Sequence, residues 1–236
     1  MTAIALAASH IRAGYGGREV LASVDLAVNK GEVFSLLGHN GAGKSTLLKV
    51  LFGLHPALSG TIELEGIAVR PTPAAMASAG VGYLPEGRGV FPNLTVRETF
   101  RLALWSASLK GEEAQSRIDE VLSILPRIRE FWTRRAGTLS GGQQQMVSIG
   151  RVLLSRPSML IMDEPSIGLA PKLLQDLLAP VRELQLQRGM SILLVEQNLD
   201  EAFAISDRVA VMRSGEIVFR GVPADFADLG AMIKYF

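Results

Sequence analysis

The sequence predicts an α/β protein whose central sheet consists of parallel strands that alternate with helices. The strand expected at 159–162 is an unbroken apolar run, which is typical of a strand covered on both faces, and apolar strands are also expected at 32–37 and 192–195. Helical periodicity follows the first two, as in parallel sheets with crossover helices. Residues 94–154 have a helical pattern throughout and predict a separate helical lobe.

Alternating apolar residues place the elements of the N-terminal half. A helix is expected to begin near Gly43, after a strand that leads into glycines, and a short helix is expected to open at Thr72 and Pro73. The expected strands span residues 4–11, 20–28, 32–37, 61–69 and 81–84.

Capping and breaking residues organise the remainder of the chain. Thr95 with Glu98, and Ser140 with Gln143, have the spacing of capping boxes and predict helix starts inside the lobe. Pro180 falls within a long helix expected over 171–188, which it should kink or split because proline lacks a backbone donor. Strands are expected at 209–212 and 217–220, joined by a turn at 214–215, and a helical tail follows.

Composition narrows the classes of function. With 236 residues and 48% apolar side chains, the chain can bury a substantial core as one domain. Its formal charge of +1 gives no overall attraction to nucleic acid, and the absence of cysteine excludes disulfides and a cysteine nucleophile. No apolar run reaches the roughly 20 residues that cross a bilayer, and the N-terminus lacks a basic leading segment. We expect no nucleic-acid partner and a cytoplasmic chain that only a partner brings to a membrane.

A phosphate-binding loop is the most specific motif. It follows an expected strand and opens an expected helix, and its glycines let backbone N–H groups point at phosphate oxygens. We expect Lys44 to reach the β- and γ-phosphates, Ser45 to ligate Mg²⁺ and Thr46 to contact the α-phosphate. The loop consists of Gly38, His39, Asn40, Gly41, Ala42, Gly43, Lys44, Ser45 and Thr46.

Two carboxylates end the apolar strand at 159–162. Buried strands rarely end in Asp163 and Glu164 without a cation to neutralise them. With a phosphate loop in the same chain, Asp163 is suited to hold Mg²⁺ through water, and Glu164 to act as the general base that orients the attacking water.

The start of a second helix offers another site that can grip, that is bind, a phosphate group. Ser140 caps a helix whose first turn is glycine, so that backbone N–H groups lie open to an anion. Because the Lys44 loop already serves one nucleotide, we expect this second grip to serve a nucleotide bound to another subunit. The motif consists of Leu139, Ser140, Gly141, Gly142 and Gln143, followed by two further glutamines.

The loop at 38–46, the run at 139–145 and the strand ending in Asp163 and Glu164 together resemble the ATP-binding cassette (ABC) family. They occur in the family's order, and the resemblance covers nearly the whole chain. It implies a P-loop NTPase (RecA-like) core with an N-terminal antiparallel β-subdomain and an inserted helical subdomain. The implied cofactors are ATP and Mg²⁺.

The resemblance also implies a division of the chain and a pairing of subunits. Two cassettes would face each other head to tail, with each ATP lying between Lys44 of one subunit and Ser140 of the other. The single domain, 1–236, would comprise a nucleotide-binding core at 1–86 and 155–236 and a helical signature subdomain at 87–154.

Individual positions match or depart from the family pattern. Tyr15 matches the aromatic residue that stacks on adenine. Glu86 stands where most members have a glutamine that senses Mg²⁺, which a carboxylate can still meet through oxygen. Gln197 stands where most have a histidine that contacts the γ-phosphate, and it can donate a hydrogen bond but carries no positive charge. Ala170 replaces the aspartate that is common in the loop after Glu164.

The segments 85–96, 168–171 and 195–198 resemble the F-type ATPase subunit of branched-chain amino-acid importers, and urea and amide importers use closely similar cassettes. The implied partners are a second cassette, identical or G-type, two transmembrane permease subunits and, indirectly, a periplasmic binding protein. The chain would then lie at the cytoplasmic face of the inner membrane. The groove for the permease's coupling helix is expected to be lined by Arg88, Val90, Phe91 and Leu94.

Two other classes of protein stay open at this point. A soluble ABC ATPase of DNA repair or translation usually carries a long coiled-coil insertion or two cassettes in one chain, and 236 residues hold neither. A P-loop kinase or GTPase would leave the motif at Ser140 without a purpose.

Overall fold

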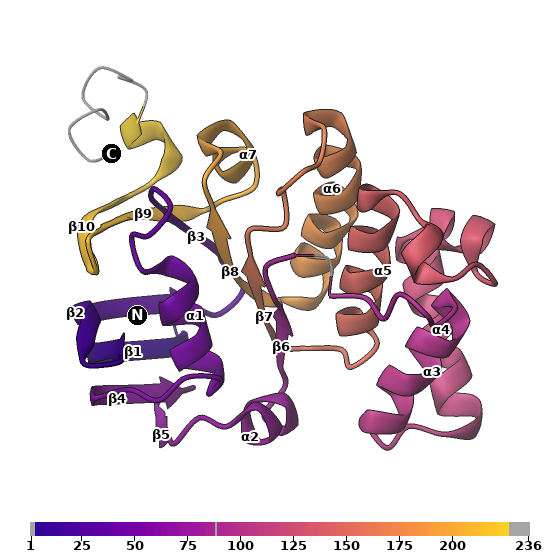
Figure 1. The fold of residues 1–236 in the computed structure, drawn as a ribbon, viewed down its shortest axis with the longest axis horizontal. Coiled ribbons are helices and arrows are strands. Elements are labelled where there is room, and N and C mark those ends of the chain that lie inside the picture. Colours follow the sequence, from indigo (N-terminus) through magenta and orange to yellow (C-terminus); the bar gives the residue numbers. More distant parts are fainter. Residues whose placement is uncertain (1–2, 88, 227–236) are drawn as a thin grey trace.

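The computed structural model describes residues 3–87 and 89–226, and it contains two sheets and a group of helices (Figure 1). In this described part, one sheet has four strands in the order β2-β1-β4-β5, and the other has six in the order β10-β9-β3-β8-β7-β6. All neighbouring strands of the first sheet are antiparallel. The second sheet is parallel except for β10, which runs antiparallel to β9. The predicted α/β class and the parallel core are confirmed.

The four-stranded sheet differs from the expected strands in two respects. β1 and β2 are longer than expected because their pairing continues to Tyr15 and Arg18. His10 and Ser23, with φ of 52° and 97°, interrupt the alternation within both strands. The single strand expected over 61–69 is wrong, because Glu65 and Gly66, with φ of 52° and 80°, form a tight turn between two strands. The strands are β1 (Ile4–Tyr15), β2 (Arg18–Asn29), β4 (Ser59–Leu64) and β5 (Ile67–Val69).

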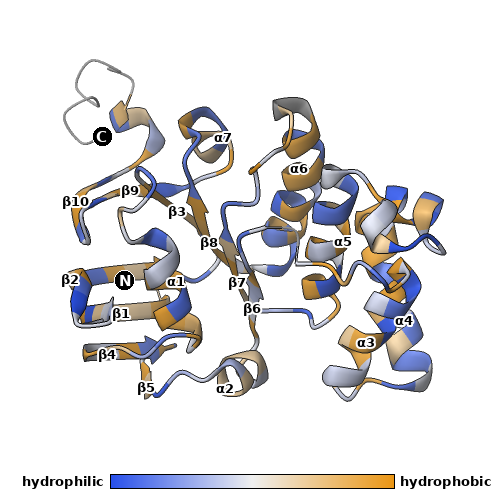
Figure 2. Cartoon of the chain, viewed as in Figure 1, coloured by the Kyte–Doolittle hydropathy of each residue, from blue (hydrophilic) through white to orange (hydrophobic). Residues whose placement is uncertain are grey.

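The six-stranded sheet lies at the centre of the molecule, and its middle strands are strongly apolar (Figure 2). Every residue of β3, β7 and β8 is buried. Because these strands are parallel, their carboxyl ends meet at one edge of the sheet. The strands are β3 (Val33–Leu37), β6 (Val81–Leu84), β7 (Met159–Asp163), β8 (Ser191–Glu196), β9 (Arg208–Arg213) and β10 (Glu216–Gly221).

Alternate residues of the central strands pack into different cores. In β8, Ile192 and Leu194 join a cluster with the helices of the lobe, whereas Leu193 and Val195 join a cluster with α1 and the four-stranded sheet. The sheet is therefore covered on both faces, as the unbroken apolar run at 159–162 predicts.

Helices cover the core sheet and form the lobe. The two predicted capping boxes are confirmed at α3 and α5. α6 runs through Pro180 as one helix, so the expected split is wrong, and the expected C-terminal tail lies largely outside the described residues. The helices are α1 (Lys44–Phe52), α2 (Pro73–Ser78), α3 (Val96–Ser106), α4 (Gly111–Ile124), α5 (Gly141–Leu153), α6 (Pro171–Arg188) and α7 (Leu199–Phe203), with 3₁₀ turns at Pro126–Phe131, Ala136–Thr138 and Pro223–Phe226.

Candidate functional site

The loop between β3 and α1 has its shape because glycines occupy crowded positions. A Cβ atom at Gly38 would lie 2.3 Å from the carbonyl oxygen of Met212, and one at Gly43 would lie 2.9 Å from Leu21 Cδ2. Gly43 also has a φ of 107°, which favours glycine. No side chain of the described residues caps the N-terminus of α1, so its first N–H groups are available to an anion.

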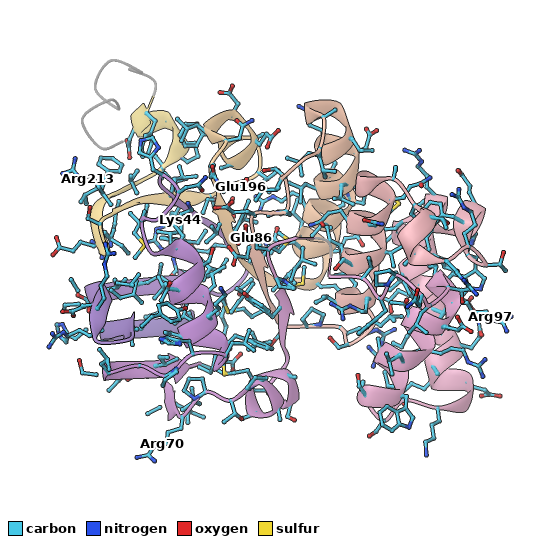
Figure 3. The ribbon with its side chains drawn as sticks, in the orientation of Figure 1. Lys44, Arg70, Glu86, Arg97, Glu196 and Arg213 are labelled. Carbon is cyan, nitrogen blue, oxygen red and sulfur yellow. The ribbon has the colours of Figure 1, made fainter. Side chains whose placement is uncertain are left out.

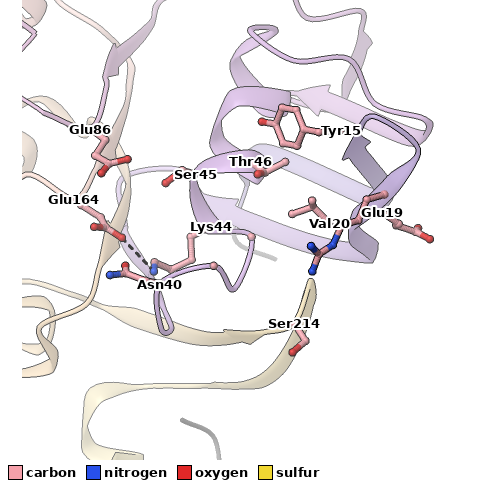
Figure 4. Close-up of a pocket in the computed structure, with 13 residues that line it drawn as sticks. Tyr15, Glu19, Val20, Asn40, Lys44, Ser45, Thr46, Glu86, Glu164 and Ser214 are labelled. Carbon is pink, nitrogen blue, oxygen red and sulfur yellow. Dashed lines mark ion pairs between the residues drawn. The ribbon is translucent and has the colours of Figure 1, made fainter.

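Lys44 is buried at the start of α1 and surrounded by oxygen atoms. Its Nζ donates to the carbonyl oxygens of Gly38 at 2.7 Å and His39 at 3.1 Å, and it lies 3.2 Å from Glu164 Oε1 (Figure 4). The ammonium group is held inside the curl of the loop, where the phosphates of a nucleotide would lie.

Asp163 and Ser45 meet at the edge of the sheet. Ser45 Oγ donates to Asp163 Oδ1 at 2.9 Å, while Asp163 Oδ2 is buried without a hydrogen-bond partner among residues 3–87 and 89–226. Burial raises the pKa of Asp163 to about 6, and the hydrogen bond from Ser45 opposes that rise. A fully buried carboxylate with an unused oxygen beside a serine hydroxyl fits the oxygen ligand set of Mg²⁺.

Glu164 follows Asp163 and is held from two sides. Its backbone φ is 47°, and its N–H donates to the carbonyl oxygen of Val195 at 2.9 Å. Besides the ion pair with Lys44, its Oε2 accepts a hydrogen bond from Gln197 Nε2 at 2.5 Å. The carboxylate at the end of β7 is thus connected to both the phosphate loop and the segment after β8.

These residues open onto a cavity of about 610 Å³ between the loop and the four-stranded sheet (Figure 4). The cavity brings together nine of the residues expected at the site, which are Tyr15, Asn40, Gly41, Gly43, Lys44, Ser45, Thr46, Glu86 and Glu164. Tyr15 is 47% exposed, and its ring stacks on His55 with centroids 4.2 Å apart. An aromatic face at one end and an ammonium group at the other suit a ligand with a flat ring and phosphates.

The other expected residues lie beside or away from this cavity. Within the loop, Gly38 and Ala42 are buried and His39 is exposed. Asp163 and Gln197 do not line the cavity but form hydrogen bonds with two residues that do, Ser45 and Glu164. None of the residues 139–143 lines the cavity in the described chain. Ser140 is exposed at the start of α5, where its Oγ accepts the Gln143 N–H at 3.4 Å.

Several residues of the site were missed by reasoning from the sequence. Arg18, Glu19, Val20 and Ser214 also line the cavity. Arg18 pairs with Tyr15 across the turn at Gly16 and Gly17, and a two-residue glycine turn is a signal from which that pairing can be predicted.

No signal in the sequence marked Glu196, which lies at the end of β8. It is fully buried, and its carboxylate contacts Ser166 in the loop after Glu164. That contact depends on how β7 and β8 pair, which the sequence pattern does not give.

Comparisons with known proteins agree with this geometry. A family model described as ABC transporter matches residues 21–167. The chain is 42% identical over 211 residues to the high-affinity branched-chain amino acid transport ATP-binding protein BraG of Pseudomonas aeruginosa, covering 89% of both chains. It is 38% identical over 219 residues to a probable branched-chain amino acid transport ATP-binding protein LivF of Archaeoglobus fulgidus, covering 92% of both.

Solved structures give the same result for the fold. The ADP conformation of an ATP-binding cassette of an ABC transporter superimposes with a TM-score of 0.88 at 29% identity, covering 99% of this chain and 97% of that one. A nucleotide-free cassette gives a TM-score of 0.82 at 31% identity, covering 93% and 91%. In the part of the chain that the structure describes, no helix is long and apolar enough to cross a membrane.

Proposed function

The chain belongs to the ABC transporter family, and from this premise we propose that it supplies the energy for an importer of branched-chain amino acids. As an ABC ATPase it hydrolyses ATP to drive transport. The names of two relatives at about 40% identity that cover most of this chain support the choice of solute. The likeness of the segments 85–96, 168–171 and 195–198 to the F-type subunit of such importers also supports it.

One arrangement carries the proposed chemistry: the buried contact of Lys44 with Glu164, next to the contact of Ser45 with Asp163. Lys44 and the N–H groups at the start of α1 bind the phosphates, and Thr46, two residues after Lys44, lines the same cavity. Tyr15 stacks on the adenine ring at the open end. These groups orient the triphosphate towards the end of β7, where the carboxylates stand.

Ser45, Asp163 and Glu86 are the residues that would hold Mg²⁺, which when bound neutralises charge on the phosphate oxygens. Glu164 takes a proton from the attacking water at its carboxylate, and Gln197 fixes the orientation of that carboxylate through its amide. Glu164 is buried, which limits the access of bulk water to its carboxylate.

The second half of the nucleotide site is proposed to come from another cassette, identical or G-type. Ser140, with Leu139, Gly141, Gly142 and Gln143, would close over the triphosphate bound by Lys44 of that partner. The exposure of Ser140 and its absence from the cavity of its own described chain support this arrangement. Closure brings two helical lobes together, in keeping with the proposed division into a core, 1–86 and 155–236, and a signature subdomain, 87–154.

Two permease subunits are proposed to dock beside the lobe and to hold the chain at the cytoplasmic face of the inner membrane. A groove of about 720 Å³ lined by Phe91, Tyr83 and Leu102 supports this, and Phe91 is 43% exposed there. Val90 and Leu94 are partly buried next to it, whereas Arg88 lies outside the described residues. A periplasmic binding protein, which contacts the permease and not this chain, would deliver the solute.

The proposed base is tested with Glu164→Gln. We expect this variant to bind ATP with Mg²⁺ but not to hydrolyse it, and to accumulate as a nucleotide-bound dimer in size-exclusion chromatography. Turnover at the wild-type rate would remove Glu164 from this role.

The solute is tested by uptake of labelled leucine in cells that carry only the Glu164→Gln cassette, with an unrelated labelled solute as the control. Unchanged leucine uptake would contradict the branched-chain assignment and leave the ATPase unaffected.

A further inference from the structure

Glu196 is a fully buried carboxylate at the last position of β8, in the interior of the molecule (Figure 3). Its Oε1 accepts a hydrogen bond from the backbone N–H of Ser166 at 3.1 Å, and its Oε2 accepts one from Ser166 Oγ at 2.6 Å. Oε2 also accepts the backbone N–H of Gln197 at 3.3 Å. The carboxylate therefore holds one serine at two atoms and the adjacent residue at a third.

This carboxylate is costly to bury. No cation forms an ion pair with it among residues 3–87 and 89–226, and the charged group that acts on it most clearly is Glu201, another carboxylate. Burial raises its pKa to about 7, although the three hydrogen bonds oppose the rise. A buried, unpaired acidic group next to a catalytic centre is an indication of function, because an apolar residue would fill the same space at lower cost.

The contacts of Glu196 lie on both sides of Glu164. Ser166 follows Glu164 by two residues and belongs to the loop at 164–170. Gln197 donates its side-chain amide to Glu164 Oε2. Glu196 thus connects the chain that leaves Glu164 with the backbone of Gln197, whose side chain contacts Glu164, and the two backbone N–H groups can bond only to an acceptor.

We infer that Glu196 is a positioning residue for hydrolysis, which ties the loop at 164–170 to Gln197 and thereby fixes the Glu164 carboxylate. This rests on the proposed role of Glu164 as the base. A glutamine at position 196 keeps the size of the side chain but has only one acceptor oxygen, so that it cannot accept both the Ser166 N–H and the Gln197 N–H. The phosphate loop and Tyr15 make no hydrogen bond to Glu196 in the described chain, so nucleotide binding is independent of it.

The test uses the full chain with saturating ATP and Mg²⁺. We expect Glu196→Gln to lower kcat by about 10- to 100-fold, with the Kd for ATP within about twofold of wild type. Ser166→Ala is expected to give a similar loss of kcat, and the double variant little more than either alone. Hydrogen exchange at the backbone amide of Ser166 or of Gln197 should become faster in Glu196→Gln, because one oxygen cannot accept both N–H groups.

Glu32→Gln is the matched control. Glu32 is also a buried carboxylate of the core sheet region, and it accepts the Asn29 N–H at 2.6 Å, but it lies before β3, at the opposite end of the sheet. A change there should alter stability and leave kcat unchanged. The inference is overturned if Glu196→Gln keeps wild-type kcat, if the two losses multiply in the double variant, or if Glu32→Gln lowers kcat equally. Normal turnover by Glu164→Gln would instead overturn the proposed function.

Discussion

Replacing Asp163 by asparagine is expected to stabilise the protein when nucleotide and metal are absent. The carboxylate is fully buried, and its Oδ2 has no hydrogen-bond partner within the described residues. Its pKa is raised from 3.8 to about 6, which corresponds to about 3 kcal/mol of unfavourable free energy when the folded protein carries the charge. Asparagine has the same shape and can still accept the Ser45 hydroxyl. The variant should therefore have a free energy of unfolding about 3 kcal/mol higher than wild type at about pH 8.

The sign of the pH dependence is fixed by the direction of the pKa shift. Because the pKa of Asp163 is higher in the folded state, the folded protein binds more protons than the unfolded chain between about pH 4 and about pH 6. The contribution of this group to stability thus falls as the pH rises through that window. Asp163→Asn has no titrating group there, so its advantage should be full at about pH 8 and nearly absent at about pH 4.

Urea unfolding in EDTA, followed by the fluorescence of the two tryptophans, measures the free energy of unfolding of wild type and variant at each pH. Adding Mg²⁺ and ATP should reverse the order, because only wild type retains the full ligand set and gains stability from binding. A variant that is less stable than wild type at about pH 8 without ligand would refute the reasoning. So would an advantage of equal size at both pH values, because it could not come from the charge.

Three further substitutions test local geometry. Gly53 and Gly189 end α1 and α6 with φ of 82° and 64°, but a Cβ at Gly53 would lie 2.5 Å from backbone atoms before α2, whereas one at Gly189 meets nothing within 4 Å. Gly189→Ala should cost about 1 kcal/mol in urea unfolding and Gly53→Ala about 3 kcal/mol, and equal costs would show that the close contact is unimportant. His55 stacks on Tyr15, so His55→Ala should weaken ATP binding about threefold with kcat unchanged. The exposed His10 provides the control, and an equal effect of His10→Ala in the same titration would contradict the role of the stack.

The parts of the fold that follow from local pattern could be predicted from the sequence. The central strands are largely apolar and buried at every position, so their burial and their parallel arrangement were predictable. The hairpin between β4 and β5 was not predicted, although the Glu65-Gly66 pair carries a turn signal, because apolar residues continue on both sides of it. Pro180 does not split α6, since packing of Leu177, Leu178 and Val181 into the core outweighs one lost hydrogen bond.

The part of the site that a single continuous motif forms could be predicted from the sequence. The loop from Gly38 to Thr46 contains both the glycines that shape it and the lysine that it surrounds, so spacing alone indicates the chemistry. Glu196 could not be found in this way. Its partner Ser166 is thirty positions away in the sequence, and the two meet because β7 lies next to β8. Side chains that act through a neighbouring strand leave no periodic signal in either segment.

The two helix starts that the sequence indicates as phosphate grips differ in a way that bears on their proposed roles. In the described chain α1 has no side-chain cap, and its N–H groups depend on the loop and on a ligand. α5 is capped by its own residues, because Ser140 accepts the Gln143 N–H and the Gln143 side chain accepts the Ser140 N–H. A capping box of this kind contributes about 1 kcal/mol, so the α5 start is stable without an anion and can exchange its cap for a partner's phosphate at low cost. That asymmetry suits a site in which one grip retains the nucleotide and the other engages and releases it in each cycle.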